Sequence, residues 1–294
     1  MRMPTVAVIG GDERQRYAAE YLRRMGCCVR TWGLFGTDGE NPRGILPADV
    51  VLLPLPVTAD QVRVATPLAP KQAGVRFSEI VELLPVGTLL LGGKLPAAWK
   101  TEAGARGLTV RDYAEDPLFQ LKNATPTAEG ALLLAMEHLS CTLWDTRVAV
   151  TGYGRIASLL ADRLRSMGAR TLVLARREES LTEARARGHE TARLINGQPI
   201  DLPEDCRAVF NTVPYPIFDR ASAERFPPAC VYIELASLPG GIDLGAAGAC
   251  GIRMVRGGGL PGRCFPESAG RIVAQTVLAC FPISNGKNGE DEPI

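Results

Sequence analysis

Short, uninterrupted apolar runs recur along this chain, and segments with helical spacing of apolar residues separate them. Over the first 124 residues the runs lie at 5–9, 27–32, 50–53, 88–91 and 108–110. Continuous Val and Leu runs without polar alternation are typical of strands that are buried on both faces of a sheet. Their alternation with helices predicts a parallel α/β layer. We expect Ser78 to cap one of these helices and Pro96 to open another.

The same pattern restarts after a long helix. This helix is expected to have Thr125 as its N-cap and Pro126 in its first position. Further strands are expected at 147–151, 171–175, 208–213, 231–235 and 253–255. The sequence therefore predicts two doubly wound parallel-sheet domains, residues 1–124 and 125–265, with a cleft between them. A last helix within 266–284 is expected to pack back on the first domain.

Composition and charge exclude several classes of protein. The 294 residues include 33 basic and 32 acidic side chains, without a block of like charges, so we expect neither a nucleic-acid partner nor a membrane surface. Only two histidines are present and the eight cysteines form no C-x-x-C motif, so we expect no metal site. No targeting segment or membrane-spanning run is apparent, which indicates a cytoplasmic protein with reduced thiols.

A glycine-rich turn follows the first strand of the second domain. Gly152, Tyr153, Gly154, Arg155, Ile156 and Ala157 form the pattern G-x-G-x-x-A between a strand and a helix. In this context the first glycine permits a tight turn, the second lets the backbone approach a pyrophosphate, and the helix N-terminus faces the phosphates. The second domain is therefore predicted to be a Rossmann dinucleotide-binding domain. The competing interpretation is a glycine-rich turn that binds nothing.

The end of the next strand indicates which dinucleotide is bound. An NAD site places Asp or Glu there to hold the ribose diol, whereas this chain has Arg176 and Arg177. Guanidinium groups suit a 2′-phosphate, so we expect NADP in preference to NAD. The alternative is that both arginines are solvated charges in a loop.

Three further loops are candidates for the site. Asn211, Thr212 and Pro214 follow a strand and are expected to line the nicotinamide side. Two Gly-rich loops would bind a substrate carboxylate through their backbone amides and through Arg263. They are 234–243, which contains Ser237, and 257–268, which contains Gly262, Arg263 and Ser268. The competing interpretation of each of these two loops is a plain tight turn.

The first domain and the connecting helix supply the remaining candidates. Asp12 and Arg14 lie in the first strand–helix turn and would contact substrate, although Asp12 would also serve as a helix cap. No residue is assigned to catalytic proton transfer, and the candidates are Glu129 and His138. Dipole complementarity alone would explain Glu129 in the first turn of the expected helix.

Five motifs together resemble the A subunit of bacterial dipicolinate synthase over nearly the whole chain. In order, they are Ile9-Gly10-Gly11-Asp12-x-Arg14-Gln15, Pro126-Thr127-x-Glu129-Gly130, Gly152-Tyr153-Gly154-Arg155, Leu235-Ala236-Ser237-x-Pro239-Gly240-Gly241-x-Asp243 and Gly259-Leu260-Pro261-Gly262-Arg263-x-x-Pro266-x-Ser268-Ala269-Gly270. The glycine fingerprint is generic, whereas the N-terminal turn and the two later loops are specific.

The resemblance implies a sporulation enzyme that branches from lysine biosynthesis in the cytoplasm of the mother cell. It would oxidise a dihydrodipicolinate-type ring to pyridine-2,6-dicarboxylate with a nicotinamide cofactor, beside a flavoprotein-like B subunit, and a homo-oligomer is also compatible. Because aromatisation drives this oxidation, a shortage of histidine is no obstacle. The alternatives are an NADP-dependent dehydrogenase of the 2-hydroxy or amino acid type, with His138 or Lys94 as base, and a dinucleotide-binding regulatory subunit.

Overall fold

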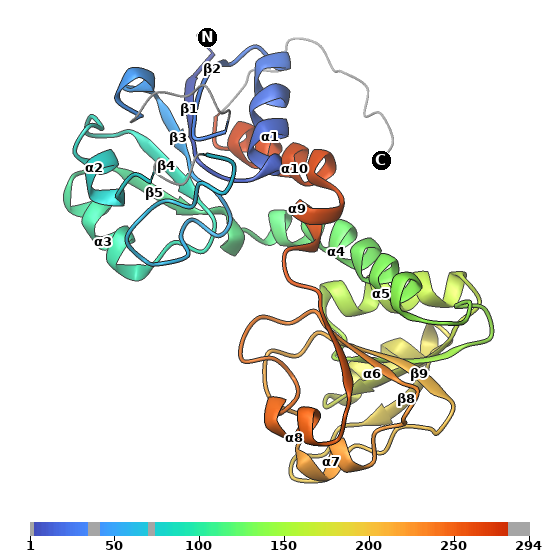
Figure 1. Ribbon diagram of the computed structural model, residues 1–294. Helices are drawn as coiled ribbons and strands as arrows, with labels where there is room; N and C mark the ends of the chain where they lie inside the picture. Colours follow the sequence, from blue (N-terminus) through green and yellow to red (C-terminus); the bar gives the residue numbers. More distant parts are fainter. Residues whose placement is uncertain (1–2, 35–41, 70–73, 282–294) are drawn as a thin grey trace. The chain divides into compact units, whose positions relative to one another are not determined.

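The computed structural model describes residues 3–34, 42–69 and 74–281, and the chain divides into two compact units. The first unit comprises Met1–Gln120 together with Pro266–Ile294, and the second comprises Leu121–Phe265 (Figure 1). The C-terminal segment therefore belongs to the same unit as the N-terminus.

The first unit is an α/β layer around a parallel sheet. Its elements are β1 (Thr5–Ile9), α1 (Glu13–Arg24), β2 (Cys28–Trp32), η1 (Pro42–Ile45), β3 (Val50–Leu52), α2 (Phe77–Val81), β4 (Leu89–Gly92), α3 (Ala97–Ala105), β5 (Thr109–Asp112), η2 (Tyr113–Glu115) and α10 (Pro266–Ala279). Among the described residues the sheet has five strands in the order β2-β1-β3-β4-β5, and each pairing is parallel.

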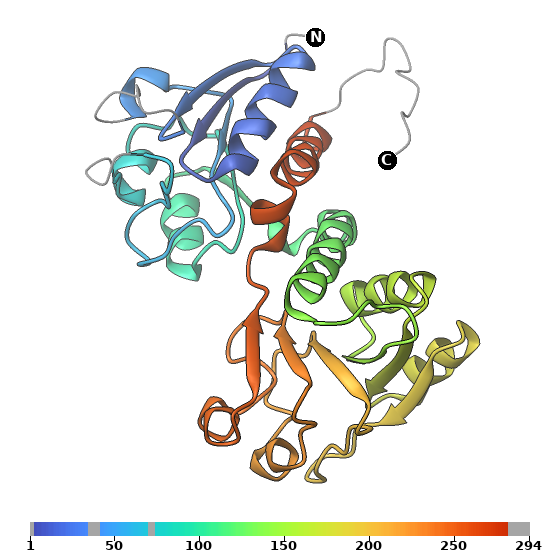
Figure 2. The ribbon, with the colours of Figure 1, turned by 45° about the vertical axis from the view of Figure 1, so that its right-hand side comes forward.

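Helices cover both faces of this sheet. Val6 and Val8 of β1 belong to a buried cluster with residues of α1 and α10, whereas Ala7 and Ile9 belong to a cluster with α2 and α3. Because successive side chains of a strand point to opposite faces, this division places the helices in two layers. Helices α1 and α10 lie side by side in both ribbon views (Figures 1 and 2).

The second unit is a larger layer of the same kind. Its elements are α4 (Pro117–His138, whose first turn lies in the first unit), β6 (Arg147–Thr151), α5 (Arg155–Ser166), β7 (Arg170–Ala175), α6 (Glu178–Ala186), β8 (Glu190–Arg193), β9 (Cys206–Asn211), α7 (Arg220–Glu224), β10 (Val231–Glu234), α8 (Leu244–Ala249), β11 (Arg253–Arg256) and α9 (Leu260–Cys264). The strand order is β11-β10-β9-β6-β7-β8, all parallel (Figure 2). This order is that of dinucleotide-binding sheets, in which the strand order reverses beside the first strand, here β6.

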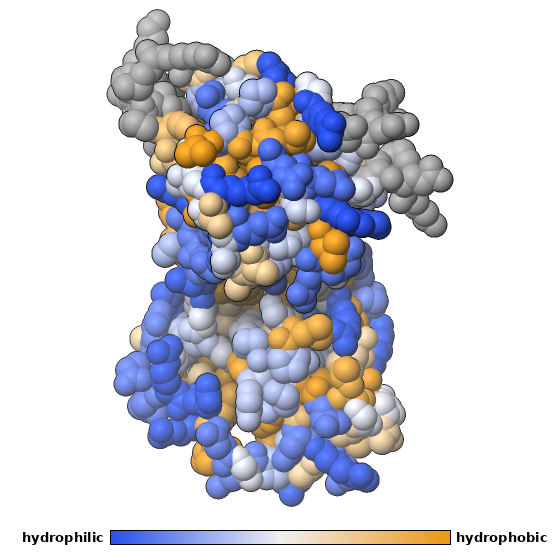
Figure 3. All heavy atoms as spheres, turned by 90° about the vertical axis from the view of Figure 1, so that its left-hand side faces the viewer, coloured by the Kyte–Doolittle hydropathy of each residue, from blue (hydrophilic) through white to orange (hydrophobic). Residues whose placement is uncertain are grey.

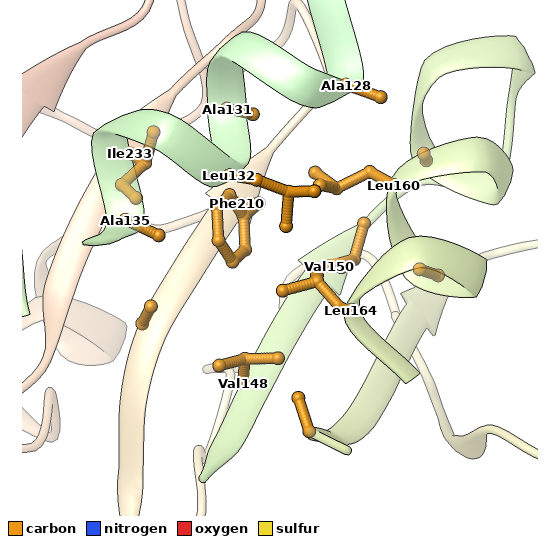
Figure 4. Packing of buried hydrophobic residues seen from close by; sticks show 14 of the residues in the cluster. Ala128, Ala131, Leu132, Ala135, Val148, Val150, Leu160, Leu164, Phe210 and Ile233 are labelled. Carbon is orange, nitrogen blue, oxygen red and sulfur yellow. The ribbon is translucent and has the colours of Figure 1, made fainter. Parts of the chain in front are cut away.

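The core of the second unit is built on β6 in the same way. Val148 and Val150 pack against α4 and α5, where Leu132 and Leu160 point toward the sheet (Figure 4). Ala149 faces a separate cluster on the opposite side of the sheet. The prediction of two doubly wound parallel-sheet domains is therefore confirmed, and the cleft between them stays a prediction.

The structure corrects two predicted helix starts. Helix α4 begins at Pro117, so Thr125 does not cap it and Pro126 lies in its interior. The turn after Pro126 is held by the Thr127 hydroxyl, which donates to the Asn123 carbonyl at 2.7 Å. In α2, Ser78 is inside the helix and Arg76 is the N-cap.

The surface carries mixed side chains. Figure 3 shows hydrophilic residues over most of the face, with apolar residues in small separate patches. Among the described residues, no helix combines the length and the hydropathy needed to cross a membrane.

Candidate functional site: a pocket at the glycine turn of the second unit

The turn between β6 and α5 is shaped for close approach to its backbone. Gly152 has φ +83°, and a Cβ there would lie 2.7 Å from the Thr212 hydroxyl oxygen. Gly154 is the N-cap of α5, and a Cβ built on it would meet nothing within 4 Å. Ala157 is fully buried against the sheet. The turn thus leaves open space in front of the α5 N-terminus, where unpaired N–H groups favour an anion.

A pocket of about 460 Å³ opens at this turn. It is lined by Gly152, Tyr153, Gly154, Ala175, Arg176, Arg177, Ser180, Leu194, Val213 and Ile217. The structure therefore brings together the predicted glycine turn and both predicted arginines. Arg155 and Ile156 begin α5 beside it. The apolar contributors Leu194 and Ile217 were not predicted, because they come from segments without a regular pattern.

The two arginines supply positive charge at the pocket. Both side chains are exposed, and within the described residues neither guanidinium has an ion-pair or hydrogen-bond partner. Arg177 is also the N-cap residue of α6. At the end of β7, where an NAD site would place a carboxylate, residues 175–177 are Ala, Arg and Arg, and none of the described residues that line the pocket is acidic.

Tyr153 is supported from beneath by the buried His189. The two rings meet edge to face with centroids 6.4 Å apart. His189 Nδ1 lies 2.6 Å from the Thr171 hydroxyl, and Nε2 lies 3.0 Å from the Asp162 carboxylate. Burial and the negative charge of Asp162 raise the pKa of Tyr153. No sequence pattern indicated a role for His189, and its contacts make it a support for the turn.

Asn211 is occupied by partners within the fold. It is fully buried, its Oδ1 accepts from the Thr151 hydroxyl at 2.5 Å, and its Nδ2 donates to Glu234 Oε1 at 2.6 Å. Thr212 donates from its hydroxyl to the Thr151 carbonyl at 2.8 Å, and Pro214 is exposed. Asn211 therefore fixes the ends of neighbouring strands, and contact of Thr212 and Pro214 with a cofactor stays a prediction.

The amides of loop 234–243 bind an internal carboxylate. Glu234 is 7% exposed; its Oε1 accepts from Ala236 N at 3.0 Å and its Oε2 from Gly241 N at 2.8 Å. The sequence predicts that the amides of this loop bind substrate, but those of Ala236 and Gly241 bind Glu234 instead. A buried carboxylate needs hydrogen-bond donors of its own. Tyr232 also donates to Glu234 at 3.2 Å, and burial raises the pKa of this tyrosine. Ser237 in the same loop is exposed.

The loop after β11 forms the short helix α9. Gly259, with φ +68°, is its N-cap, and Gly262 lies inside it. Arg263 is exposed and donates from Nη1 to the Gly258 carbonyl at 3.2 Å. Ser268 is exposed in the first turn of α10 and belongs to the first unit. That Arg263 and Ser268 hold one ligand stays a prediction.

In the first unit, Asp12 and Arg14 bind one another. Asp12 caps α1 by accepting from Arg14 N at 3.0 Å, and its Oδ2 accepts from Arg14 Nη2 at 2.7 Å. Arg14, 7% exposed, also donates to the Leu55 carbonyl. Nearby, the buried Tyr113 hydroxyl donates to the Leu53 carbonyl at 3.2 Å, and burial raises the pKa of Tyr113. The pair therefore organises the carboxyl end of this sheet.

The two candidates for proton transfer lie on α4. Exposed Glu129 accepts from Arg163 of α5 at 3.4 Å, and His138, the last residue of α4, lies 3.4 Å from Arg253 through Nδ1. Neither is among the described residues that line the pocket at the glycine turn. Their contacts are those of surface charges.

Comparison with known proteins gives concordant results. The family model for the N-terminal domain of the dipicolinate synthase A subunit matches residues 5–114. The A subunit of dipicolinate synthase from Bacillus subtilis (strain 168) is 27% identical, covering 96% of this chain and 98% of the relative. The crystal structure of the A subunit of dipicolinate synthase from Bacillus halodurans superposes with a TM-score of 0.82 at 26% identity, covering 95% of this chain and 98% of that one.

More distant structures share the fold alone. A transhydrogenase from Sinorhizobium meliloti has a TM-score of 0.62 at 14% identity, covering 94% of this chain and 92% of that one. The apo-structure of D-lactate dehydrogenase from Escherichia coli has a TM-score of 0.58 at 14% identity, covering 93% of this chain and 94% of that one. These two proteins therefore share the fold of this chain.

Proposed function

We propose that this chain oxidises a dihydrodipicolinate-type ring to pyridine-2,6-dicarboxylate, with NADP as hydride acceptor, during sporulation, because it resembles the A subunit of dipicolinate synthase over nearly its whole length. The observation that carries the proposal is the pocket at the glycine turn, which joins an open helix N-terminus to two unpaired arginines. In the balanced reaction one hydride passes from the ring to NADP⁺ and one proton is released.

The residues of the pocket fit the dinucleotide. The open space at Gly154 admits a pyrophosphate to the α5 N-terminus, as the fingerprint requires. Arg176 and Arg177 would hold the 2′-phosphate with planar donor groups, and Val213 and Ile217 provide apolar contact. When bound, the nicotinamide ring supplies the acceptor for the hydride.

Positioning a dianionic ring is the main task of the substrate side. The groups proposed to orient its two carboxylates are Arg263, Gly262, Ser268, Ser237 and the Asp12–Arg14 pair. Aromatisation makes the oxidation favourable, so orientation can supply much of the rate acceleration without a strong base. Proton transfer has no assigned residue, and Glu129 and His138 stay candidates.

A second protein is part of the proposal. The relatives are named as A subunits of a dipicolinate synthase, which implies a further component, and we infer a flavoprotein-like B subunit in the cytoplasm of the mother cell. A homo-oligomer of this chain is compatible with that complex.

An assay of the purified full chain tests the activity. The chain is supplied with NADP⁺ and enzymatically generated dihydrodipicolinate, with and without the B subunit, and the ultraviolet absorbance of dipicolinate is followed. We expect product together with stoichiometric NADPH. A matched control omits NADP⁺. Absence of product in both arms would refute the proposed reaction, and product only with the partner would assign the reaction to the complex.

A further inference from the structure

A second pocket adjoins the dinucleotide pocket at Arg176. It has a volume of about 460 Å³ and is lined by Arg176, Arg193, Leu194, Ile195 and Asn196. Two of these residues, Arg176 and Leu194, line the first pocket as well. The two pockets therefore adjoin at the Arg176 and Leu194 side chains.

Strand β8 brings Arg193 to this place. β8 is the edge strand next to β7, and their parallel register pairs Ala175 with Arg193. The Leu194 amide donates to the Ala175 carbonyl at 2.9 Å, which extends the pairing past the end of β8. Neighbouring strands lie about 4.8 Å apart, so Arg193 stands at the same sheet edge as Arg176, one strand farther out.

Three cations meet there without a counter-charge. Within the described residues, the guanidiniums of Arg176, Arg177 and Arg193 have no ion-pair or hydrogen-bond partner. Helix α6 has three acidic residues, of which Glu178 pairs with Arg185 and Glu183 pairs with Arg187 at 2.9 Å. The third, Glu179, is exposed, and among the described residues it forms no ion pair with any of the three arginines. Arg176 and Arg177 line the first pocket, and Arg176 and Arg193 line the second, so each pocket has two exposed arginines, which favour an anion as its occupant.

We propose that Arg193 is a third binding group for the 2′-phosphate of NADP and that the adjoining pocket is the subsite for this phosphomonoester. The inference rests on the proposed NADP-dependent function. In dinucleotide-binding sheets an arginine near the end of the second strand accommodates the 2′-phosphate, and that strand corresponds to β7, whose outer neighbour is β8. Arg193 then adds to the preference for NADP that Arg176 and Arg177 provide, because NAD has only a neutral hydroxyl at that position.

Binding measurements on the full-length chain test the assignment. Isothermal titration with NADPH and with NADH is performed on the wild type, Arg193→Gln, Arg176→Gln and Arg253→Gln. Arg253 is an exposed arginine that begins β11, the other edge strand of the same sheet, and its replacement changes the net charge by the same amount. Melting temperatures check that each variant is folded.

We expect Arg193→Gln to weaken NADPH binding about tenfold, which corresponds to about 1.4 kcal/mol, while NADH binding changes less than about twofold. Arg253→Gln should change neither affinity. The 2′-phosphate loses its second charge below about pH 6. Wild-type affinity for NADPH should therefore fall on acidification through that pH, and the fall should be shallower in Arg193→Gln.

The outcomes separate this inference from the proposed function. If Arg176→Gln weakens NADPH binding selectively and Arg193→Gln does not, the role of Arg193 is refuted and the NADP proposal stands. If Arg193→Gln weakens both dinucleotides equally, Arg193 does not discriminate between them and its assignment is refuted. If the wild type binds NADPH and NADH equally, both proposals are refuted.

Discussion

At the residue scale, the buried carboxylate of Glu234 connects two segments of the candidate site. It accepts from Asn211 Nδ2 on β9 and from the Gly241 amide of the loop that follows β10. Gly240 and Gly241 are needed there, because a Cβ on Gly241 would lie 2.3 Å from Asn211 Nδ2 and one on Gly240 would lie 2.8 Å from Glu234 Oε2. The loop closes over the carboxylate and fixes the strand ends below the pocket.

Replacing Glu234 by Gln should destabilise the second unit. Each carboxylate oxygen of Glu234 accepts from a backbone amide, that of Ala236 or that of Gly241. The NH₂ group of Gln would replace one of these oxygens and leave that amide without an acceptor, which costs about 1–3 kcal/mol for a buried donor. The free energy of unfolding, measured by urea denaturation, should fall by that amount. Glu224→Gln is the matched control, since Glu224 is exposed and its one ion pair among the described residues is with exposed Arg220. We expect a change within about 0.5 kcal/mol. Equal stability of Glu234→Gln and the control would contradict the prediction.

The sequence could predict which residues gather at the site, but not all of their partners. Gly152, Gly154, Arg176 and Arg177 were found because each occupies a fixed place after a strand. The glycines of loop 234–243 indicate that its backbone amides are accessible, yet the sequence does not show that the buried Glu234 carboxylate accepts hydrogen bonds from two of them. That contact depends on tertiary burial, which local patterns do not encode.

At the element scale, the same limit explains β8 and α4. β8 has the sequence E-T-A-R with only Thr191 half-buried, because an edge strand needs no apolar run, and it was not predicted. Pro126 resembles a helix start, yet it lies inside α4, where it has no N–H to donate to the carbonyl four residues earlier. Burial of Ala128, Ala131 and Ala135 on the same helix offsets this loss. Apolar runs, by contrast, located the remaining strands.

The packing of α10 on α1 depends on Gly270. A Cβ there would lie 2.5 Å from the Arg14 carbonyl oxygen and 2.7 Å from Tyr17 Cβ, and the backbone oxygen cannot rotate away. We expect overpacking in Gly270→Ala to lower the free energy of unfolding of the first unit by about 1–3 kcal/mol. The better helix propensity of Ala offsets about 1 kcal/mol of this loss.

Gly104→Ala is the control for this substitution. Gly104 lies in α3, and a Cβ on it would meet nothing within 4 Å. It should therefore stabilise the chain by up to about 1 kcal/mol. Urea denaturation of both variants measures the change in the free energy of unfolding, which should be negative for Gly270→Ala and positive for Gly104→Ala. A Gly270→Ala variant as stable as Gly104→Ala would show that the two helices do not approach as closely as described.

At the scale of the whole molecule, each unit has its own core on both faces of its own sheet. Chains with two such cores commonly unfold in more than one step. The dinucleotide pocket is built entirely from residues of the second unit, whereas Asp12 and Arg14 belong to the first. In the proposed function, the cofactor contacts all lie in the second unit, whereas the substrate contacts come from both units. A ligand that contacts only one unit should therefore stabilise that unit alone.

Hydrogen exchange with and without NADP⁺ tests this division. A ligand at about 100 times its Kd stabilises the form that binds it by about 2.7 kcal/mol, which slows exchange through unfolding by about 100-fold. We expect this slowing in β6, β7 and β9, and no change in β1, β3 and β4, as measured by mass spectrometry of peptides. NADH at the same multiple of its own Kd is the control and should slow the same peptides. Equal slowing in both sheets would show that the units unfold together, and slowing confined to the first sheet would place the dinucleotide in the wrong unit.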